Sequence, residues 1–200
     1  SAGIIAKDKI KFKKLLTYHA IPTADWDYVY TLQDEVNEEL AYPLIVKPAV
    51  FDSSIGISNE SVVHNKKELK RQIKKVLTEL KCPALIEEYI EGDEYRVSII
   101  GNTDSDLQIL PLSRYIFTEL LGSYQHIFTY ESKWGENKIY DNLIAQYPVR
   151  NINKKLETLL TEIALDTFRI TNARDYAVVE FRVDEDDNPY VLEIGTNPSL

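Results

Sequence analysis

Two glutamates near the C-terminus, Glu180 and Glu193, are the residues best placed for chemistry. Each lies in a run of β-forming residues, and an acidic turn separates the two runs, which is the pattern of a hairpin. If the turn centres on Asp186 and Asp187, the two glutamates face each other across the strands. Like charges paired in this way destabilise a sheet, so a hard divalent cation between the carboxylates would explain the arrangement. Two solvated surface glutamates are an equally good interpretation of the hairpin alone.

Strand alternation also predicts which hairpin side chains are buried. One face of each strand is apolar, and the opposite face carries the glutamates. We expect these apolar residues to pack on a core: Ala177, Val179, Phe181 and Val183 from the first strand, and Tyr190, Leu192 and Ile194 from the second.

Two upstream segments offer groups that could bind phosphate. Lys47 interrupts the apolar run 43–49, where an ammonium costs desolvation unless it meets an anion. A snorkelling edge-strand lysine is the better interpretation of Lys47 alone. The segment Asp52–Gly56, here called the serine loop, offers hydroxyls and backbone N–H groups that can cradle phosphates. An ordinary turn explains it equally simply.

An acidic cluster follows the next apolar run. Glu87, Glu88 and Glu94 surround Tyr89 and a Gly-Asp turn. Carboxylates beside an aromatic ring can accept hydrogen bonds from an amino group or from sugar hydroxyls. Taken alone, the segment is better interpreted as a solvated turn between strands.

The elements that must position these groups predict an α+β fold. We expect helices at 8–19, 65–81 and 151–171, strands at 26–32, 43–49, 84–90, 94–100 and 108–117, an acidic helix or loop up to residue 40, a mobile loop at 122–142, and the closing hairpin at 175–195. This order predicts two α+β lobes that join near residues 88–93. Residues 1–20 would be an N-terminal helix leading into the domain, 21–91 the small lobe and 92–200 the large lobe.

Composition narrows the classes of partner. The chain has 200 residues and a net charge of −9 without a long basic run, so we expect no nucleic acid partner. No apolar stretch reaches transmembrane length, so we expect no membrane partner. The single cysteine, Cys82, cannot form an internal disulfide, which fits a reducing, cytoplasmic setting. The absence of methionine indicates a processed N-terminus or a piece of a longer chain.

The order of these segments resembles the ATP-grasp superfamily, and most closely the D-alanine–D-alanine ligases. The similar stretches are YPLIVKPAVFDSSIGIS, LIEEYIEGDEYRVSIIG and YAVVEFRVDEDDNPYVLEIGTNPSL. The resemblance extends from Lys7 to Leu200 and rests on joint order and spacing rather than on any single motif.

The resemblance implies an ATP-grasp fold with ATP bound between two lobes. By position, Lys9 and Lys47 match lysines that touch the nucleotide phosphates, and Lys133 matches a loop lysine that reaches the γ-phosphate on closure. The matching cofactor-binding positions are completed by Ser53, Ser54 and Gly56 in the phosphate-covering loop, by Glu87, Glu88, Tyr89 and Ile90 at the adenine hinge, and by Glu94 at the ribose. Glu180 and Glu193 match two ligands of Mg²⁺, or of Mn²⁺ in its place.

The implied reaction has two steps. ATP phosphorylates a carboxylate to an acyl phosphate, and an amine then displaces phosphate to form an amide or peptide bond. Lys47 and Lys133 would act catalytically by stabilising charge that develops during phosphoryl transfer. The substrates would be small amino acids or other carboxylates, and a homodimer is a family expectation.

Several positions depart from the family pattern. Glu180 stands where the family usually has aspartate, and Ser199 replaces a glycine of the amine-substrate site. Gly195 stands where the family has an asparagine metal ligand. That ligand is therefore missing, unless Asn197 or water substitutes. Val178 stands where the family has a catalytic arginine. Alternation puts Arg182 on the same face of the strand as Val178, but nothing in the sequence assigns it the role of that arginine. Asp52 stands where the phosphate loop has glycine. A nucleotide-binding module with weak or no ligase activity, or a domain that keeps only the fold, therefore remain alternatives, although the intact lysines argue against the second.

Overall fold

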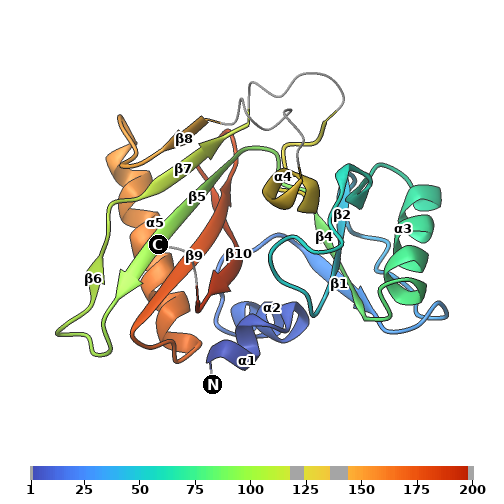
Figure 1. Cartoon of the computed structure of the whole chain (residues 1–200), viewed down its shortest axis with the longest axis horizontal. Coiled ribbons are helices and arrows are strands. Elements are labelled where there is room, and N and C mark those ends of the chain that lie inside the picture. The colour runs from blue at the N-terminus through green and yellow to red at the C-terminus, as the bar shows by residue number, and fades with distance from the viewer. Residues whose placement is uncertain (1, 118–123, 136–143, 198–200) are drawn as a thin grey trace.

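The chain folds into two antiparallel β-sheets with helices packed against them (Figure 1). The computed structural model describes residues 2–117, 124–135 and 144–197. The smaller sheet has the order β1-β4-β2-β3, from β1 (Trp26–Val29), β2 (Leu44–Pro48), β3 (Val62–Val63) and β4 (Ala84–Glu88). The larger sheet has the order β10-β9-β5-β7-β8 with β6 paired to β5, from β5 (Asp93–Ile100), β6 (Gln108–Ile109), β7 (Ser113–Ile116), β8 (Ile144–Gln146), β9 (Tyr176–Val183) and β10 (Pro189–Gly195). The predicted α+β class is confirmed, whereas the predicted lobe boundaries remain a prediction.

Helix α3 (Lys66–Thr78) covers the smaller sheet. Its N-cap Asn65 accepts a hydrogen bond from the Glu68 N–H at 3.0 Å, which satisfies one of the free donors of the first turn. Leu69, Ile73 and Val76 recur at helical spacing and are buried against the strands. A short 3₁₀ turn, η1 (Asn59–Ser61), leads into β3.

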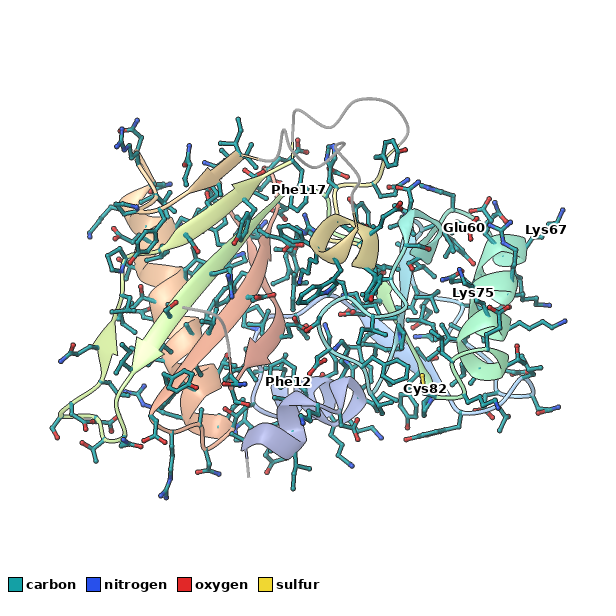
Figure 2. The ribbon with its side chains drawn as sticks, viewed as in Figure 1. Phe12, Glu60, Lys67, Lys75, Cys82 and Phe117 are labelled. Carbon is teal, nitrogen blue, oxygen red and sulfur yellow. The ribbon has the colours of Figure 1, made fainter. Side chains whose placement is uncertain are left out.

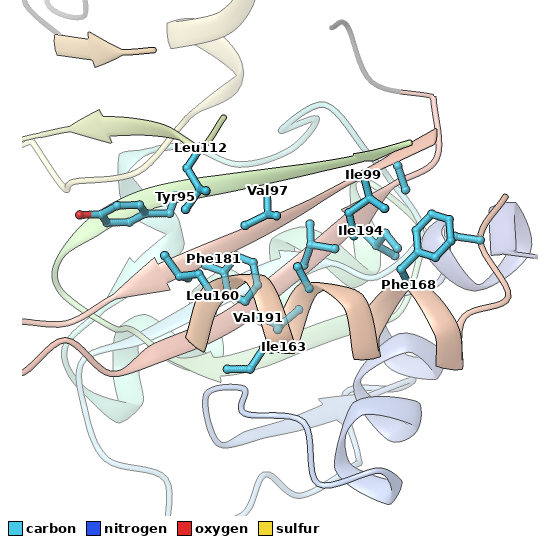
Figure 3. Close-up of a cluster of buried hydrophobic side chains, with 14 of the residues drawn as sticks. Tyr95, Val97, Ile99, Leu112, Leu160, Ile163, Phe168, Phe181, Val191 and Ile194 are labelled. Carbon is cyan, nitrogen blue, oxygen red and sulfur yellow. The ribbon is translucent and has the colours of Figure 1, made fainter. Parts of the chain in front are cut away.

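Helix α5 (Lys154–Ile170) covers the larger sheet and forms the main core with it (Figure 3). Its buried side chains include Leu160, Ile163 and Phe168, which contact residues of β5, β9 and β10. Val97 and Phe181, from adjacent strands, are fully buried in the same cluster. These three strands therefore bury one face in the core, and their other face is available for a site.

Helices α1 (Ala2–Ala6) and α2 (Lys9–Tyr18) lie beside both sheets (Figure 1). Asp8 caps α2 by accepting a hydrogen bond from the Lys11 N–H at 3.1 Å. Phe12, labelled in Figure 2, packs in the core of the larger sheet, whereas Ile10 packs against Leu85 of the smaller sheet. Helix α2 thus links the two sheets.

Several element predictions need correction. The single strand expected at 108–117 is split into β6 and β7, and Pro111 between them has no N–H to donate to a ladder. The strand expected to reach Leu32 ends at Val29. The described part of the loop expected at 122–142 contains a short helix, α4 (Tyr130–Trp134), capped by Thr129; residues 122–123 and 136–142 lie outside the described residues. No helix in the described part of the chain combines the length and the apolar character needed to cross a membrane.

Candidate functional site

Glu180 and Glu193 are paired directly across β9 and β10, as expected. They reach this register through a β-bulge at Leu192, because Val191 still pairs with Phe181 on the near side of the bulge. Next to the turn, the strand pairing is therefore shifted by one residue from the expected register. The extra residue of the bulge, Leu192, compensates for this shift and brings the two glutamates opposite each other.

The bulge also changes which side chains β10 buries. Val191 and Ile194 enter the core, whereas Tyr190 and Leu192 do not. The prediction that Tyr190 and Leu192 pack on the core was wrong, because an inserted residue shifts the alternation of the strand by one position. Leu192 instead lines a cavity beside the glutamates.

This cavity, the inner cavity, lies between the two sheets and collects most of the predicted site residues. It has a volume of about 90 Å³. An outer hollow of about 570 Å³ adjoins it and shares Glu94, Lys133, Glu180 and Glu193 with it. Together they reach the range of about 300–1,000 Å³ that is typical of small-molecule sites. The predicted residues that line the inner cavity are Lys9, Lys47, Ser54, Glu87, Glu88, Tyr89, Ile90, Glu94, Lys133, Glu180 and Glu193.

Two predicted residues lie elsewhere. Ser53 lines only the outer hollow, together with Asp52. Gly56 lines neither space, and a Cβ at its position would stand 2.6 Å from Leu80 Cδ1 and 2.8 Å from Pro48 Cγ. Gly56 has a φ of +78°, so its structural role is to let the backbone turn against these side chains.

Each glutamate of the pair already has a protein cation beside it. Lys9 Nζ lies 3.4 Å from Glu193 Oε2, and Arg96 Nε lies 3.1 Å from Glu180 Oε1. Burial and then the Glu193 carboxylate raise the pKa of Glu180 to about 7. Burial also opposes ionisation of Glu193, but Lys9, followed by Lys133, lowers its pKa below the usual range. The pair therefore shares its negative charge unequally, with Glu193 the more ionised member.

Glu87 is 2% exposed and binds two lysines at once. Lys47 Nζ lies 2.6 Å from Glu87 Oε2, and Lys13 Nζ binds Oε1. Burial disfavours the carboxylate, yet the two ammonium groups hold the pKa of Glu87 at about 2. Lys13 also donates to the Thr23 hydroxyl, which donates in turn to the Val191 carbonyl at 2.8 Å. Sequence reasoning missed Lys13, although its spacing of three residues from both Ile10 and Leu16 places it on the buried face of α2.

Glu94 is held by Arg182, which is itself buried. Arg182 Nη2 donates to Glu94 Oε1 at 2.8 Å, and Nη1 donates to the Gly92 carbonyl at 2.7 Å. Burial raises the pKa of Glu94 although Arg182 opposes the effect. Arg182 thus has a positioning role and is not available to a ligand.

The hinge at the end of β4 contains one backbone N–H without an acceptor among the described residues. The N–H groups of Glu88 and Tyr89 donate to the carbonyls of Asp25 and Pro43, both at 2.9 Å. The Ile90 N–H has no backbone or side-chain acceptor in residues 2–117, 124–135 and 144–197. Because Ile90 lines the inner cavity, this N–H can serve a ligand there.

The serine loop is strained and is fastened to α4. Ser53 and Ser54 have φ values of 54° and 59°, and the turn is closed by the Ile55 N–H donating to the Asp52 carbonyl at 3.0 Å. Non-glycine residues at positive φ cost about 1–3 kcal/mol each and cluster at functional sites. The Trp134 indole N–H donates to the Ser53 carbonyl at 3.3 Å, so the loop and the helix that carries Lys133 cover the site together.

The donor set for a metal ion consists of the glutamate pair. No group of three His, Cys, Asp or Glu side chains in the described ranges is arranged to hold a metal ion. Asn197 Oδ1 accepts a hydrogen bond from the Tyr176 hydroxyl at 3.0 Å. Mg²⁺ is commonly held by one or two carboxylates together with substrate phosphates and water. The pair therefore fits one Mg²⁺ ion that also binds a phosphorylated ligand.

The comparisons with known proteins agree on one family. The sequence matches the family described as "D-ala D-ala ligase C-terminus" over residues 14–200. A D-alanine–D-alanine ligase of Carboxydothermus hydrogenoformans is 32% identical over 208 residues, covering 100% of this chain and 61% of the relative. The "Uncharacterized protein y4sG" of Sinorhizobium fredii is 32% identical over 200 residues, covering 98% of this chain and 54% of the relative.

A solved structure shows the same likeness. The crystal structure of the D-alanine–D-alanine ligase of Bacillus anthracis complexed with ATP is 25% identical, with a TM-score of 0.73, and covers 98% of this chain and 57% of that chain. The present chain thus spans 54% to 61% of the length of these relatives.

Proposed function

The chain belongs to the family of D-alanine–D-alanine ligase C-terminal domains, and on that premise we propose that it is the ATP- and Mg²⁺-dependent part of a carboxylate–amine ligase. Its fold is the ATP-grasp fold, as the sequence predicts. The observation that carries the proposal is the inner cavity, which brings together three lysines, a hinge with a free backbone N–H, and a pair of facing carboxylates.

In this proposal the adenine of ATP occupies the inner cavity. Ile45, Ile57, Ile127 and Leu192 provide apolar walls for a flat aromatic ring. The Ile90 N–H donates to a ring nitrogen, and Glu94, positioned by Arg182, accepts from the ribose hydroxyls through the oxygen that the arginine leaves free.

The phosphates then extend toward the glutamate pair and the outer hollow. Lys9, Lys133 and, from β2, Lys47 line the inner cavity and supply positive charge along this passage. Lys47 stays bound to Glu87 on one side, which directs its ammonium group and leaves other protons for a phosphate oxygen. A magnesium ion between Glu180 and Glu193 would neutralise the phosphate oxygens during transfer.

The carboxylate and amine substrates are assigned to the outer hollow. It adjoins the phosphate passage, and Lys133 stands between the two spaces, with its Nζ 5.2 Å from the centre of the Phe128 ring. Lys133 is thus placed to stabilise charge on the transferring phosphoryl group. The substrates we propose are small amino acids or related carboxylates, and the setting we propose is the cytoplasm, where ATP is available.

The test is ADP release by the full-length protein with ATP, Mg²⁺ and a panel of D- and L-amino acids and dipeptides. We expect ADP release that requires both Mg²⁺ and an amino acid, and amide product detected by mass spectrometry. Absence of turnover with every acceptor, although ATP binds, would refute the ligase proposal.

A second candidate is an ATP-binding module with weak or no ligase activity. It is favoured by the pairing of Val178 with Gly195 next to the glutamate pair, because neither residue can supply a charge or a metal ligand there. Calorimetry that shows ATP binding without hydrolysis would support this candidate. A Glu180→Gln variant separates the two, because it abolishes turnover in a ligase and changes little in a module without turnover.

A further inference from the structure

Arg96 belongs to a row of charged side chains that crosses three strands. On β5, Arg96 is opposite Glu180 of β9, which is opposite Glu193 of β10. Lys9 extends the row, 3.4 Å from Glu193. The charges therefore run positive, negative, negative, positive, and each carboxylate has its own cation. The next row on the same face carries no charge and consists of Ser98, Val178 and Gly195.

Arg96 keeps hydrogen-bond donors that a ligand can use. Its Nε lies 3.1 Å from Glu180 Oε1, and only Nη1 makes a hydrogen bond to a described residue, the Tyr115 hydroxyl at 3.5 Å. The side chain is 24% exposed and lines the outer hollow beside Lys133. Arg182, the other arginine next to the site, is only 4% exposed and has both terminal nitrogens bonded to protein oxygens. Arg96 is thus the arginine that can reach a bound molecule.

The carboxylates of the row suffice for one divalent ion. Gly195, which follows Glu193 on the same face of β10, has no side chain to add a ligand, and the Asn197 amide oxygen is bonded to Tyr176. A second ion would have to share Glu180 with both the first ion and the guanidinium of Arg96. Three cationic groups around one partly buried carboxylate repel each other more than its single negative charge can offset, so Glu180 has no room for a second ion.

We propose that Arg96 takes the place of a second divalent cation in this site, and that one metal ion between Glu180 and Glu193 is the full complement. In this arrangement the guanidinium of Arg96 binds a phosphate oxygen of the nucleotide from the side of the outer hollow. The planar fork of an arginine matches two phosphate oxygens, and its charge does not depend on pH. The inference rests on the proposed function, because it assumes that a nucleotide occupies the inner cavity.

Counting bound manganese tests the inference directly. The full chain is mixed with an equal amount of β,γ-imido-ATP, which is not hydrolysed, and Mn²⁺ is titrated while free Mn²⁺ is measured by electron paramagnetic resonance. We expect one Mn²⁺ per nucleotide-bound chain at saturation and the spectrum of an isolated ion. Two ions about 3.5–4 Å apart, as in two-metal phosphoryl-transfer sites, would give a spin-coupled spectrum.

Variants of two arginines provide the second measurement. Arg96→Gln removes the charge and is expected to weaken β,γ-imido-ATP binding about tenfold or more, because a hydrogen bond to a charged group is lost. Arg96→Lys keeps the charge and should lose less affinity. Arg114→Gln is the matched control, because Arg114 lies on the adjacent strand, pairs with Asp93 at 2.8 Å and lines neither space. We expect the Arg114→Gln variant to bind β,γ-imido-ATP with an affinity within about twofold of the wild type. A change this small is well below the loss expected when a hydrogen bond to a charged group is removed.

The outcomes separate this inference from the proposed function. Two coupled Mn²⁺ ions in the wild-type complex, or an Arg96→Gln affinity within twofold of the wild type, would overturn the role of Arg96 and leave the ATP site standing. No binding of the nucleotide at all would overturn both. Because the wild-type count needs no variant, the inference remains testable even if Arg96→Gln does not fold.

Discussion

Replacing Lys13 by methionine tests whether the buried lysine pair on Glu87 stabilises the fold. Lys13 is 1% exposed and shares Glu87 with Lys47. A fall in the pKa of Glu87 from 4.5 to about 2 corresponds to roughly 3 kcal/mol of stabilisation of the ionised form. Lys13 and Lys47 supply this stabilisation together. Burial disfavours the charged form of Lys13 and lowers its pKa, and methionine in its place removes the cost of burying that charge. Because Lys47 still pairs with Glu87 in the variant, we expect Lys13→Met to lose about half of this stabilisation, about 1–2 kcal/mol of unfolding free energy at pH 7.

The loss should depend on pH in a defined direction. Because the folded-state pKa of Glu87 is depressed, its contribution is fully present above the unfolded value near 4.5 and disappears as the pH falls toward 2. The stability difference between wild type and variant should shrink over that interval.

Urea unfolding followed by tryptophan fluorescence at pH 7 and at pH values between 4.5 and 3 measures both effects. The control is Lys14→Met, one residue along on the same helix, where the side chain contacts Tyr28 in solvent and no measurable loss is expected. A Lys13→Met variant as stable as the wild type at pH 7, or a loss that does not change with pH, would refute the reasoning.

Three further predictions concern the loops and the phosphate lysine. In the proposed ligase reaction, Lys133→Ala should lower kcat by about 100-fold, since the charge proposed to act on the transferring phosphoryl group is lost. Lys154→Ala on α5 should leave kcat unchanged, and equal effects of the two substitutions would contradict the proposed role of Lys133. Trp134→Ala should raise the KM for ATP severalfold and make the serine loop cleave faster in limited proteolysis, because the indole no longer fastens that loop. Gly56→Ala should cost about 2 kcal/mol in thermal unfolding, from positive φ and the 2.6 Å approach to a leucine methyl, while Gly3→Ala, with its nearest contact at 3.8 Å, should be neutral.

Local patterns account for much of the fold. The helices at 65–81 and 151–171 were predictable because apolar residues recur at helical spacing between a polar N-cap and a polar end, and each helix buries that face. The hairpin was predictable because two alternating runs flank an acidic turn, and the expected pairing of Glu180 with Glu193 is present, although the chain reaches it through the bulge at Leu192. The break at Pro111 and the bulge at Leu192 were not predicted. One inserted residue, or one hydrogen bond missing between strands, hardly changes the β-propensity of the segment.

The residues of the candidate site also fall into those that the sequence identified and those that required the structure. The segments that hold Lys9, Lys47, Glu87, Glu94 and the serine loop were identified from order and spacing, and the structure places most of them around one cavity. Their roles toward ATP remain proposals. The partners of these residues were beyond sequence reasoning: Lys13 joins Glu87 from a helix early in the chain, and Arg182 joins Glu94 from a strand near its end.

The sequence by itself determined the α+β class and the glutamate pair, because these depend on residue types and short-range periodicity, and it determined the family through the order and spacing of its segments. Only the tertiary structure decided which cation neutralises which carboxylate. Arg96 has no local signal, and its contact with Glu180 exists because β5 pairs with β9 in one register. Coulomb interactions between buried groups depend on a few ångströms of separation, and such distances are set by packing between elements that are remote in sequence.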